Sequence, residues 1–136
     1  MIVDTSALVA IIKREPEQAA FSAILEAEKD LSISAAAYFE ASIVLDGVRQ
    51  PDISRALDDL IERAQIEIEP VTAEQARTAR QAYRVYGRGS GHAANLNFGD
   101  CFSYALARAK REPILFKGDD FGHTDLRSAV DVGRSI

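Results

Sequence analysis

The stretch Met1-Ile2-Val3-Asp4-Thr5-Ser6-Ala7-Leu8-Val9 decides the fold, because a short apolar run leads into one carboxylate, two hydroxyl residues and an apolar helical pattern. The apolar run predicts a short buried strand, and Thr5 and Ser6 are expected to cap a helix over 6–13. In open parallel sheets the ligand crevice lies just beyond the carboxyl ends of the strands. Asp4 stands at such a strand end, so the sequence predicts chemistry there.

Length and composition limit the class of protein. The chain has 136 residues, which suggests one domain with a sizeable core. Hydrophobic residues make up 47% and charged residues 27%, as in a soluble globular protein, and no apolar run is long enough to span a bilayer. No secretory leader is recognisable, and the single cysteine, Cys101, cannot form an internal disulfide. We therefore expect a cytoplasmic protein without a membrane association.

Apolar runs that predict strands alternate with helical patterns along the chain. Further strands are expected over 31–34, 66–71 and 114–116, and further helices from Pro16 and over 35–48, 52–64, 72–86 and 100–110. This alternation favours an α/β domain with a parallel central sheet.

Two acidic residues occupy positions that a structural role alone explains poorly. Asp4 is also a plausible helix N-cap, but Thr5 and Ser6 can both cap in its place. Glu40 is the only charged residue within 31–45, in the middle of an apolar helix. A carboxylate there lies either on a narrow exposed strip of the helix or beside a bound metal ion, because burial of an uncompensated charge is costly.

Two more acidic positions lie at the ends of predicted elements. Asp100 opens a helix, where the helix dipole also favours an acid. Asp119 and Asp120 follow the last strand; one suits a turn or cap and the other can point into the crevice, and spacing does not choose between them. Carboxylate ligands without His or Cys clusters suit Mg²⁺ or Mn²⁺ rather than zinc.

Basic residues gather in one acid-free window. Arg77, Arg80 and Arg84 recur at helical spacing and Arg88 follows, while no Asp or Glu occurs over 75–99. Twelve of the sixteen basic residues are Arg, whose planar fork suits phosphate. A solvated helix face is the simpler interpretation, but the missing acids favour contact with a polyanion. A metal site beside a basic rim indicates cleavage of a phosphodiester.

Four motifs occur in order along nearly the whole chain. They are Ile2-Val3-Asp4-Thr5-Ser6-Ala7-Leu8, Tyr38-Phe39-Glu40-Ala41, Asn97-Phe98-Gly99-Asp100-Cys101-Phe102-Ser103-Tyr104-Ala105-Leu106-Ala107, and Phe116-Lys117-Gly118-Asp119-Asp120-Phe121 followed by Thr124-Asp125. This ordered set resembles the PIN-domain ribonucleases, specifically the VapC toxins of bacterial type II toxin–antitoxin pairs. The resemblance implies a three-layer α/β/α fold with a short central parallel sheet, as a single domain over 1–136.

The resemblance also implies roles for individual residues. Asp4, Glu40, Asp100 and Asp120 would surround Mg²⁺ or Mn²⁺, with Asp120 chosen by the match to a Gly-x-Asp-Phe pattern. Either Thr5 or Ser6 would orient Asp4 or a metal-bound water.

The implied reaction is endonucleolytic cleavage of RNA by metal-activated water. The arginines Arg77, Arg80, Arg84 and Arg88 would position the RNA backbone. The implied partners are a small antitoxin and a second copy of the chain, joined in a higher assembly.

Two other functions stay open from the sequence. A phosphate-receiver-like signalling domain also gathers acids around Mg²⁺ and has a lysine after a late strand, as Lys117 could be. It fits poorly, because receivers have two adjacent acids after the first strand and here Thr5 follows Asp4. An inactive relative that binds RNA or protein is the third possibility.

Overall fold

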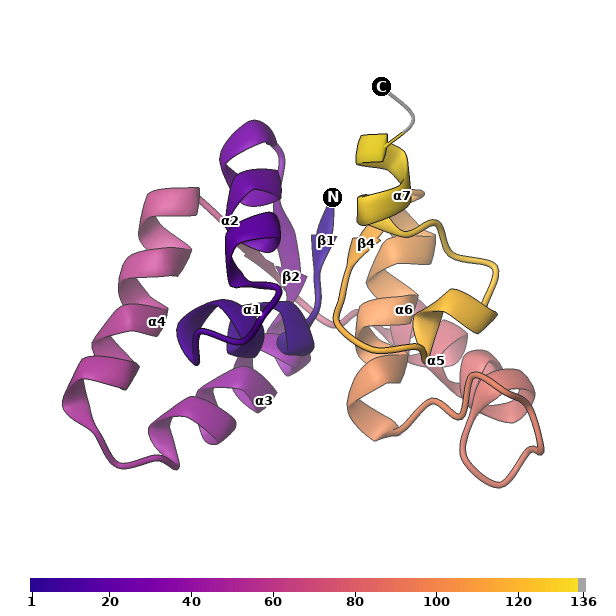
Figure 1. The fold of residues 1–136 in the computed structure, drawn as a ribbon. Coiled ribbons are helices and arrows are strands. Elements are labelled where there is room, and N and C mark those ends of the chain that lie inside the picture. Colours follow the sequence, from indigo (N-terminus) through magenta and orange to yellow (C-terminus); the bar gives the residue numbers. More distant parts are fainter. Residues whose placement is uncertain (135–136) are drawn as a thin grey trace.

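A four-stranded parallel sheet in the order β3-β2-β1-β4 forms the centre of the structure, a computed structural model that describes residues 1–134 (Figure 1). The strands are β1 (Ile2–Val3), β2 (Ser32–Ser34), β3 (Glu67–Glu69) and β4 (Ile114–Leu115). Since all pairs are parallel, the carboxyl ends of the strands share one edge of the sheet. The residues that follow β1, β2 and β4 therefore emerge on the same side of the molecule.

Helices cover both faces of this sheet. They are α1 (Thr5–Ile12), α2 (Gln18–Ala27), α3 (Ala35–Asp46), α4 (Pro51–Ala64), α5 (Ala73–Tyr86), α6 (Phe98–Lys110) and α7 (Ala129–Arg134), with a 3₁₀ turn at Phe121–His123. Helices α1 to α4 pack on one another, and α5 packs on α6, in two groups that Figure 1 shows on opposite sides of the strands. The predicted three-layer α/β/α fold with a short parallel sheet is confirmed.

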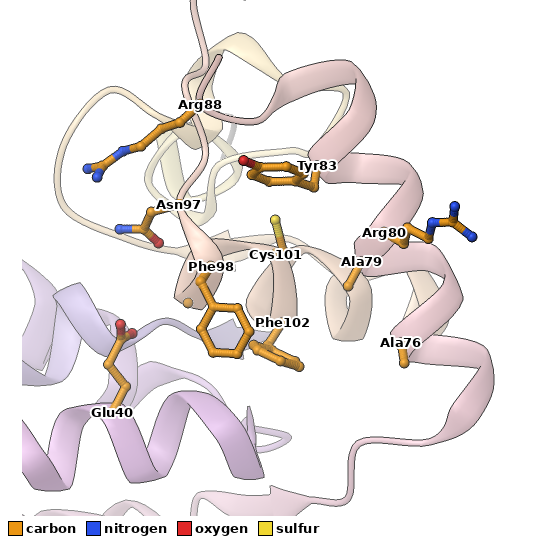
Figure 2. A pocket seen from close by; sticks show the side chains of 11 residues that line it. Glu40, Ala76, Ala79, Arg80, Tyr83, Arg88, Asn97, Phe98, Cys101 and Phe102 are labelled. Atoms are coloured by element: carbon orange, nitrogen blue, oxygen red, sulfur yellow. The ribbon is translucent and has the colours of Figure 1, made fainter. Parts of the chain in front are cut away.

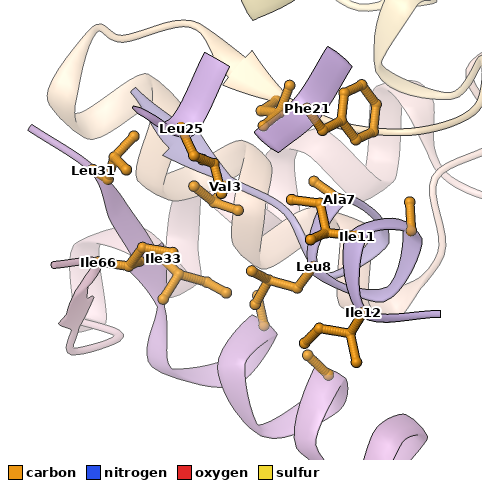
Figure 3. Packing of buried hydrophobic residues seen from close by; sticks show 14 of the residues in the cluster. Val3, Ala7, Leu8, Ile11, Ile12, Phe21, Leu25, Leu31, Ile33 and Ile66 are labelled. Atoms are coloured by element: carbon orange, nitrogen blue, oxygen red, sulfur yellow. The ribbon is translucent and has the colours of Figure 1, made fainter. Parts of the chain in front are cut away.

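Two hydrophobic cores lie on the two faces of the sheet because successive strand residues point in opposite directions. Val3 and Leu115 join the core under α1 to α4, together with Leu8, Phe21 and Ile33, as Figure 3 shows for most of that cluster. Their neighbours Ile2 and Ile114 instead join the core under α5 and α6. All four of these residues of β1 and β4 have no exposed surface, so the two short strands are apolar throughout.

The element types predicted from sequence hold, with differences at their ends. The capping prediction for the first helix is wrong: Asp4 is the N-cap of α1, because its backbone is extended and its carboxylate accepts from the Ser6 amide. Helix α6 begins at Phe98 rather than at Asp100 because Asn97 caps it. Helix α7 was not predicted, and residues 135–136 of the expected single domain lie outside the described residues. Within residues 1–134, no helix has the length and apolar character that a membrane crossing requires.

Candidate active site

The Asp4 carboxylate is held by hydrogen bonds at both oxygens. Oδ2 accepts from the Ser6 backbone N–H at 3.0 Å and from the Ser6 hydroxyl at 2.7 Å, while Oδ1 accepts from the Ser103 hydroxyl at 2.5 Å. Only 4% of Asp4 is exposed. The Ser6 hydroxyl also accepts from the Lys117 backbone N–H at 2.9 Å, which ties the end of β1 to the segment after β4.

Asp100 lies in the first turn of α6 and forms a reciprocal capping box with Asn97. The Asp100 N–H donates to Asn97 Oδ1 at 2.8 Å, and the Asn97 N–H donates to Asp100 Oδ2 at 3.0 Å. Burial, and after it the nearby charges of Asp4 and Asp120, raise the pKa of Asp100 to about 7 against the opposing Asn97 bond. The local sequence thus fixes Asp100 while the tertiary fold surrounds it with like charge.

The turn after β4 brings Asp120 to Asp100. The charge and the side chain of Asp120 both raise the pKa of Asp100. Gly118 precedes the pair of acids with a φ of +104°, a conformation that side-chain-bearing residues rarely adopt. Of the two acids in this turn, Asp120 is the one that raises the pKa of Asp100, while the Asp119 backbone carbonyl accepts from the Gly122 N–H at 3.1 Å.

Glu40 reaches the site from α3, at the side of Gly99. The residue is half-buried, and a Cβ built on Gly99 would lie less than 3.0 Å from both Glu40 carboxylate oxygens. The Glu40 carboxylate therefore occupies the space that a side chain at position 99 would take. The apolar helix face that made Glu40 conspicuous in the sequence is partly exposed, since Phe39 is 65% and Ile43 57% exposed.

The four acids Asp4, Glu40, Asp100 and Asp120 can offer a metal ion only carboxylate oxygen atoms as ligands. Among residues 1–134, none of these four acids forms a salt bridge with a Lys, Arg or His side chain or with the N-terminus. In the same residues, no three His, Cys, Asp or Glu side chains are grouped closely enough to hold a metal ion as placed. Burial, and after it the charges of Asp4 and Asp120, raise the pKa of Asp100, as expected for carboxylates brought together in a recessed site. The donor chemistry thus fits Mg²⁺ or Mn²⁺, while a closed ligand cage is not formed.

The four predicted arginines are exposed, and none of them forms a salt bridge within the described part of the chain. Arg80 and Arg88 line a cleft of about 740 Å³ between α5 and α6 that also contains Glu40, whereas Arg77 and Arg84 do not line it. Figure 2 shows Arg88 extending on the side of Asn97, while the Arg80 guanidinium points away from the aromatic residues of the cleft. The basic residues therefore flank the acidic site unevenly.

Ser6 and Thr5 have separate roles. Ser6 contacts Asp4, while the buried Thr5 hydroxyl donates to the Ala37 carbonyl at 2.8 Å and joins α1 to α3. Of the two residues expected to orient Asp4, Ser6 makes the contact. Sequence analysis missed Asn97, Gly99 and Ser103 as site residues, although Ser103 is a hydroxyl on an otherwise apolar stretch of helix, one turn after Gly99.

Lys117 and Cys101, which lie near the acids in the sequence, have structural roles. The Lys117 ammonium pairs with Glu15 at 3.2 Å and Glu17 at 3.4 Å, so it does not serve Asp4 as a receiver lysine would. Burial, with the Asp100 charge, raises the pKa of the Cys101 thiol to about 11, which keeps it protonated and a poor nucleophile.

Asp125, from the last motif, is a structural anchor. It accepts from the Tyr104 hydroxyl at 2.7 Å and from Arg108 at 2.7 Å, fastening the segment after β4 to α6. This fastening helps to hold the Asp120 turn against the first half of the helix.

The known proteins to which this chain is similar point to one family. The sequence model of the PIN-domain family matches residues 1–126. Ribonuclease VapC28 of Mycobacterium tuberculosis is 58% identical over 131 residues, which cover 96% of this chain and 98% of the relative. Ribonuclease VapC42 of the same species is 50% identical over 129 residues, covering 95% and 98% of the two chains.

The chain therefore belongs to the VapC ribonucleases of the PIN-domain family. A solved structure supports the fold independently. The crystal structure of VapC20 of M. tuberculosis, described as a toxin that cleaves the sarcin–ricin loop, aligns with a TM-score of 0.70 at 20% identity, over 93% of this chain and 98% of that one. At that identity the match bears on the fold alone.

Proposed function

We propose that this protein is a Mg²⁺- or Mn²⁺-dependent endoribonuclease and the toxin of a type II toxin–antitoxin pair. The observation that carries the proposal is the convergence of Asp4, Asp100 and Asp120, from three separate segments, into one cluster, where burial and then the crowding of like charge raise the pKa of Asp100 to about 7. Such crowding disfavours three ionised carboxylates unless a divalent cation compensates them. Family membership supports both the metal and the RNA substrate.

Asp4, Asp100, Asp120 and Glu40 would hold the metal. Bound there, the metal would lower the pKa of a water and stabilise charge on the scissile phosphate. Ser6 and Ser103 keep the Asp4 carboxylate in one orientation through bonds of 2.7 Å and 2.5 Å. Asn97 holds Asp100 Oδ2 at 3.0 Å, which leaves the other oxygen of Asp100 free to face the cluster.

The arginines position the RNA backbone rather than read bases. Arg88 and Arg80 line the cleft that contains Glu40, so phosphates flanking the scissile bond would meet positive charge as they approach an acidic pocket. Arg77 and Arg84 extend this basic surface along α5. Single-stranded or looped RNA is the expected substrate, because splayed strands can reach a recessed site.

The proposed setting is the cytoplasm, with a small antitoxin and a second copy of the chain as partners. Large apolar side chains that are exposed in the single chain support association: Phe39 and Ile43 on α3 and Phe98, 79% exposed, on α6. Exposed apolar groups of this kind commonly mark protein–protein interfaces.

The test of the proposed function is cleavage of single-stranded RNA by the purified protein with Mg²⁺ or Mn²⁺ and with a chelator. Wild-type protein should cleave only with metal, and Asp4→Asn or Asp100→Asn should abolish cleavage while far-UV circular dichroism stays unchanged. Undiminished cleavage by both folded variants, or cleavage in the chelator, contradicts the proposal. A stable aspartyl phosphate formed from a phosphate donor, without nuclease activity, would favour a receiver-like function instead.

A further inference from the structure

We propose that Gly99 and Ser103 are positioning residues for the acids: Gly99 admits the Glu40 carboxylate to the first turn of α6, and Ser103 fixes the Asp4 carboxylate one turn further along. The inference rests on the proposed metal-dependent function, because it concerns the same site. Helix α6 would then hold in place two acids, Asp4 and Glu40, that belong to other parts of the chain.

The geometry of a helix puts these two positions on one face. Residues four apart in an α-helix lie one above the other, so Gly99 and Ser103 share a face, and Asp100 projects beside it. Asp4 arrives from the end of β1 and Glu40 from the middle of α3. Sheet topology brings the ends of the strands to one edge, but α6 is the element that contacts both incoming carboxylates.

Ser103 acts through a buried hydrogen bond. Its side chain has no exposed surface, and its hydroxyl donates to Asp4 Oδ1 at 2.5 Å. The other Asp4 oxygen is already held by Ser6, so the bond from Ser103 prevents rotation of the carboxylate about its Cβ–Cγ bond. A hydrogen bond made to a metal-ligating carboxylate in this way orients the carboxylate toward the metal.

Gly99 acts by lacking a side chain. A Cβ at this position would overlap both Glu40 oxygens, whereas a Cβ on Gly122 would meet nothing within 4 Å. The atoms that Gly99 excludes are the far end of a flexible side chain, so Gly99→Ala should displace the Glu40 carboxylate and leave the backbone in place. Gly99 is not in the left-handed region, and its need for glycine comes from this contact.

The experiment measures Mn²⁺ affinity by calorimetry on the RNA-free protein, together with single-turnover cleavage and thermal melting. Gly99→Ala and Ser103→Ala should each weaken Mn²⁺ binding and slow cleavage by about 10- to 100-fold, as is usual when a group that orients a metal ligand is lost. Gly122→Ala is the matched glycine control. Ser54→Ala is the matched serine control, since it removes a 2.6 Å hydroxyl–carboxylate bond to Asp46 between α3 and α4. Both controls should behave as wild type.

Double variants test whether each residue acts through the named acid. Once Glu40→Ala has removed the displaced carboxylate, adding Gly99→Ala should cause no further loss of Mn²⁺ affinity, and the same holds for Ser103→Ala added to Asp4→Asn. If Gly99→Ala lowers the melting temperature, Glu40→Ala should restore it, because the overlap is gone.

Three results would overturn the proposal: wild-type Mn²⁺ affinity in Gly99→Ala and Ser103→Ala, additive losses in the double variants, or a melting temperature that Glu40→Ala does not restore. Failure of the proposed function is distinguishable from these results. If wild-type protein binds Mn²⁺ but cleaves no RNA, the nuclease assignment fails, while the pattern of Mn²⁺ affinities still decides the roles of Gly99 and Ser103.

Discussion

Asp4 and Glu40 belong to the same proposed site but are held in opposite ways. Asp4 is 4% exposed and accepts three hydrogen bonds from Ser6 and Ser103. Glu40 is half-buried on α3 and is located by the open space above Gly99. One acid is therefore fixed by bonds and the other by the absence of atoms, and the two should respond differently to the same kind of change.

The largest expected effect comes from changing the length of each acid while keeping its charge. Asp4→Glu should lower cleavage by more than about 100-fold, because one extra methylene breaks three bonds around a ligand. It should also lower the free energy of unfolding by about 1–3 kcal/mol, since the extra group is forced into a packed site.

Glu40→Asp serves as the comparison, because it shortens a half-buried side chain. It should reduce cleavage but leave the urea unfolding midpoint close to that of wild type. Equal losses of stability in the two variants would show that the Glu40 side chain is held as tightly as that of Asp4.

An intermediate effect should separate the two hydroxyl residues that follow Asp4. Ser6→Ala removes one bond to Asp4 and one to the Lys117 N–H, so cleavage should fall by about 10-fold or more. Thr5→Val removes the buried hydroxyl that donates to the Ala37 carbonyl, so it should cost about 1–2 kcal/mol of stability with little effect on cleavage by folded protein. Single-turnover cleavage rates and urea unfolding curves of both variants measure the loss of activity and the loss of stability separately. A stronger loss of cleavage in Thr5→Val would place Thr5 in the reaction.

The last expected effect is a pH dependence of stability in the metal-free protein. Burial and neighbouring charge raise the pKa of Asp100 from its usual 3.8 to about 7 in the folded state. Below about pH 4 the group is protonated in both states; above it the unfolded chain ionises first, so Asp100 makes stability fall as pH rises toward about 7. Urea unfolding in the presence of a chelator, repeated between about pH 4 and pH 7, measures the slope of the unfolding free energy against pH.

Asp100→Asn is the control for this prediction, since it should remove that part of the slope. Saturating Mg²⁺ should also remove it, because a cation favours the ionised carboxylate. A slope in the variant equal to that in wild type would mean that Asp100 titrates normally.

Several features of the fold were predictable because they depend on local sequence. The apolar runs Ile2–Val3 and Ile114–Leu115 are strands as expected, and α5 lies within the predicted helical range 72–86, with Thr72 as its N-cap. The start of the first helix was less predictable, since Asp4, Thr5 and Ser6 are all good caps and local preference does not rank them. The extended backbone after β1 makes Asp4 the cap.

The sequence by itself singled out Asp4, Glu40 and Asp100, and its resemblance to the PIN-domain family chose Asp120 over Asp119, before any contact was known. Only the tertiary structure decided which groups hold them. Ser103 lies 99 residues from Asp4 and Gly99 lies against a side chain from α3, and no periodicity in the chain encodes either contact. Hydrogen bonds and excluded volume between distant segments exist only after the sheet and α6 have packed together, which is why they had to be read from the folded molecule.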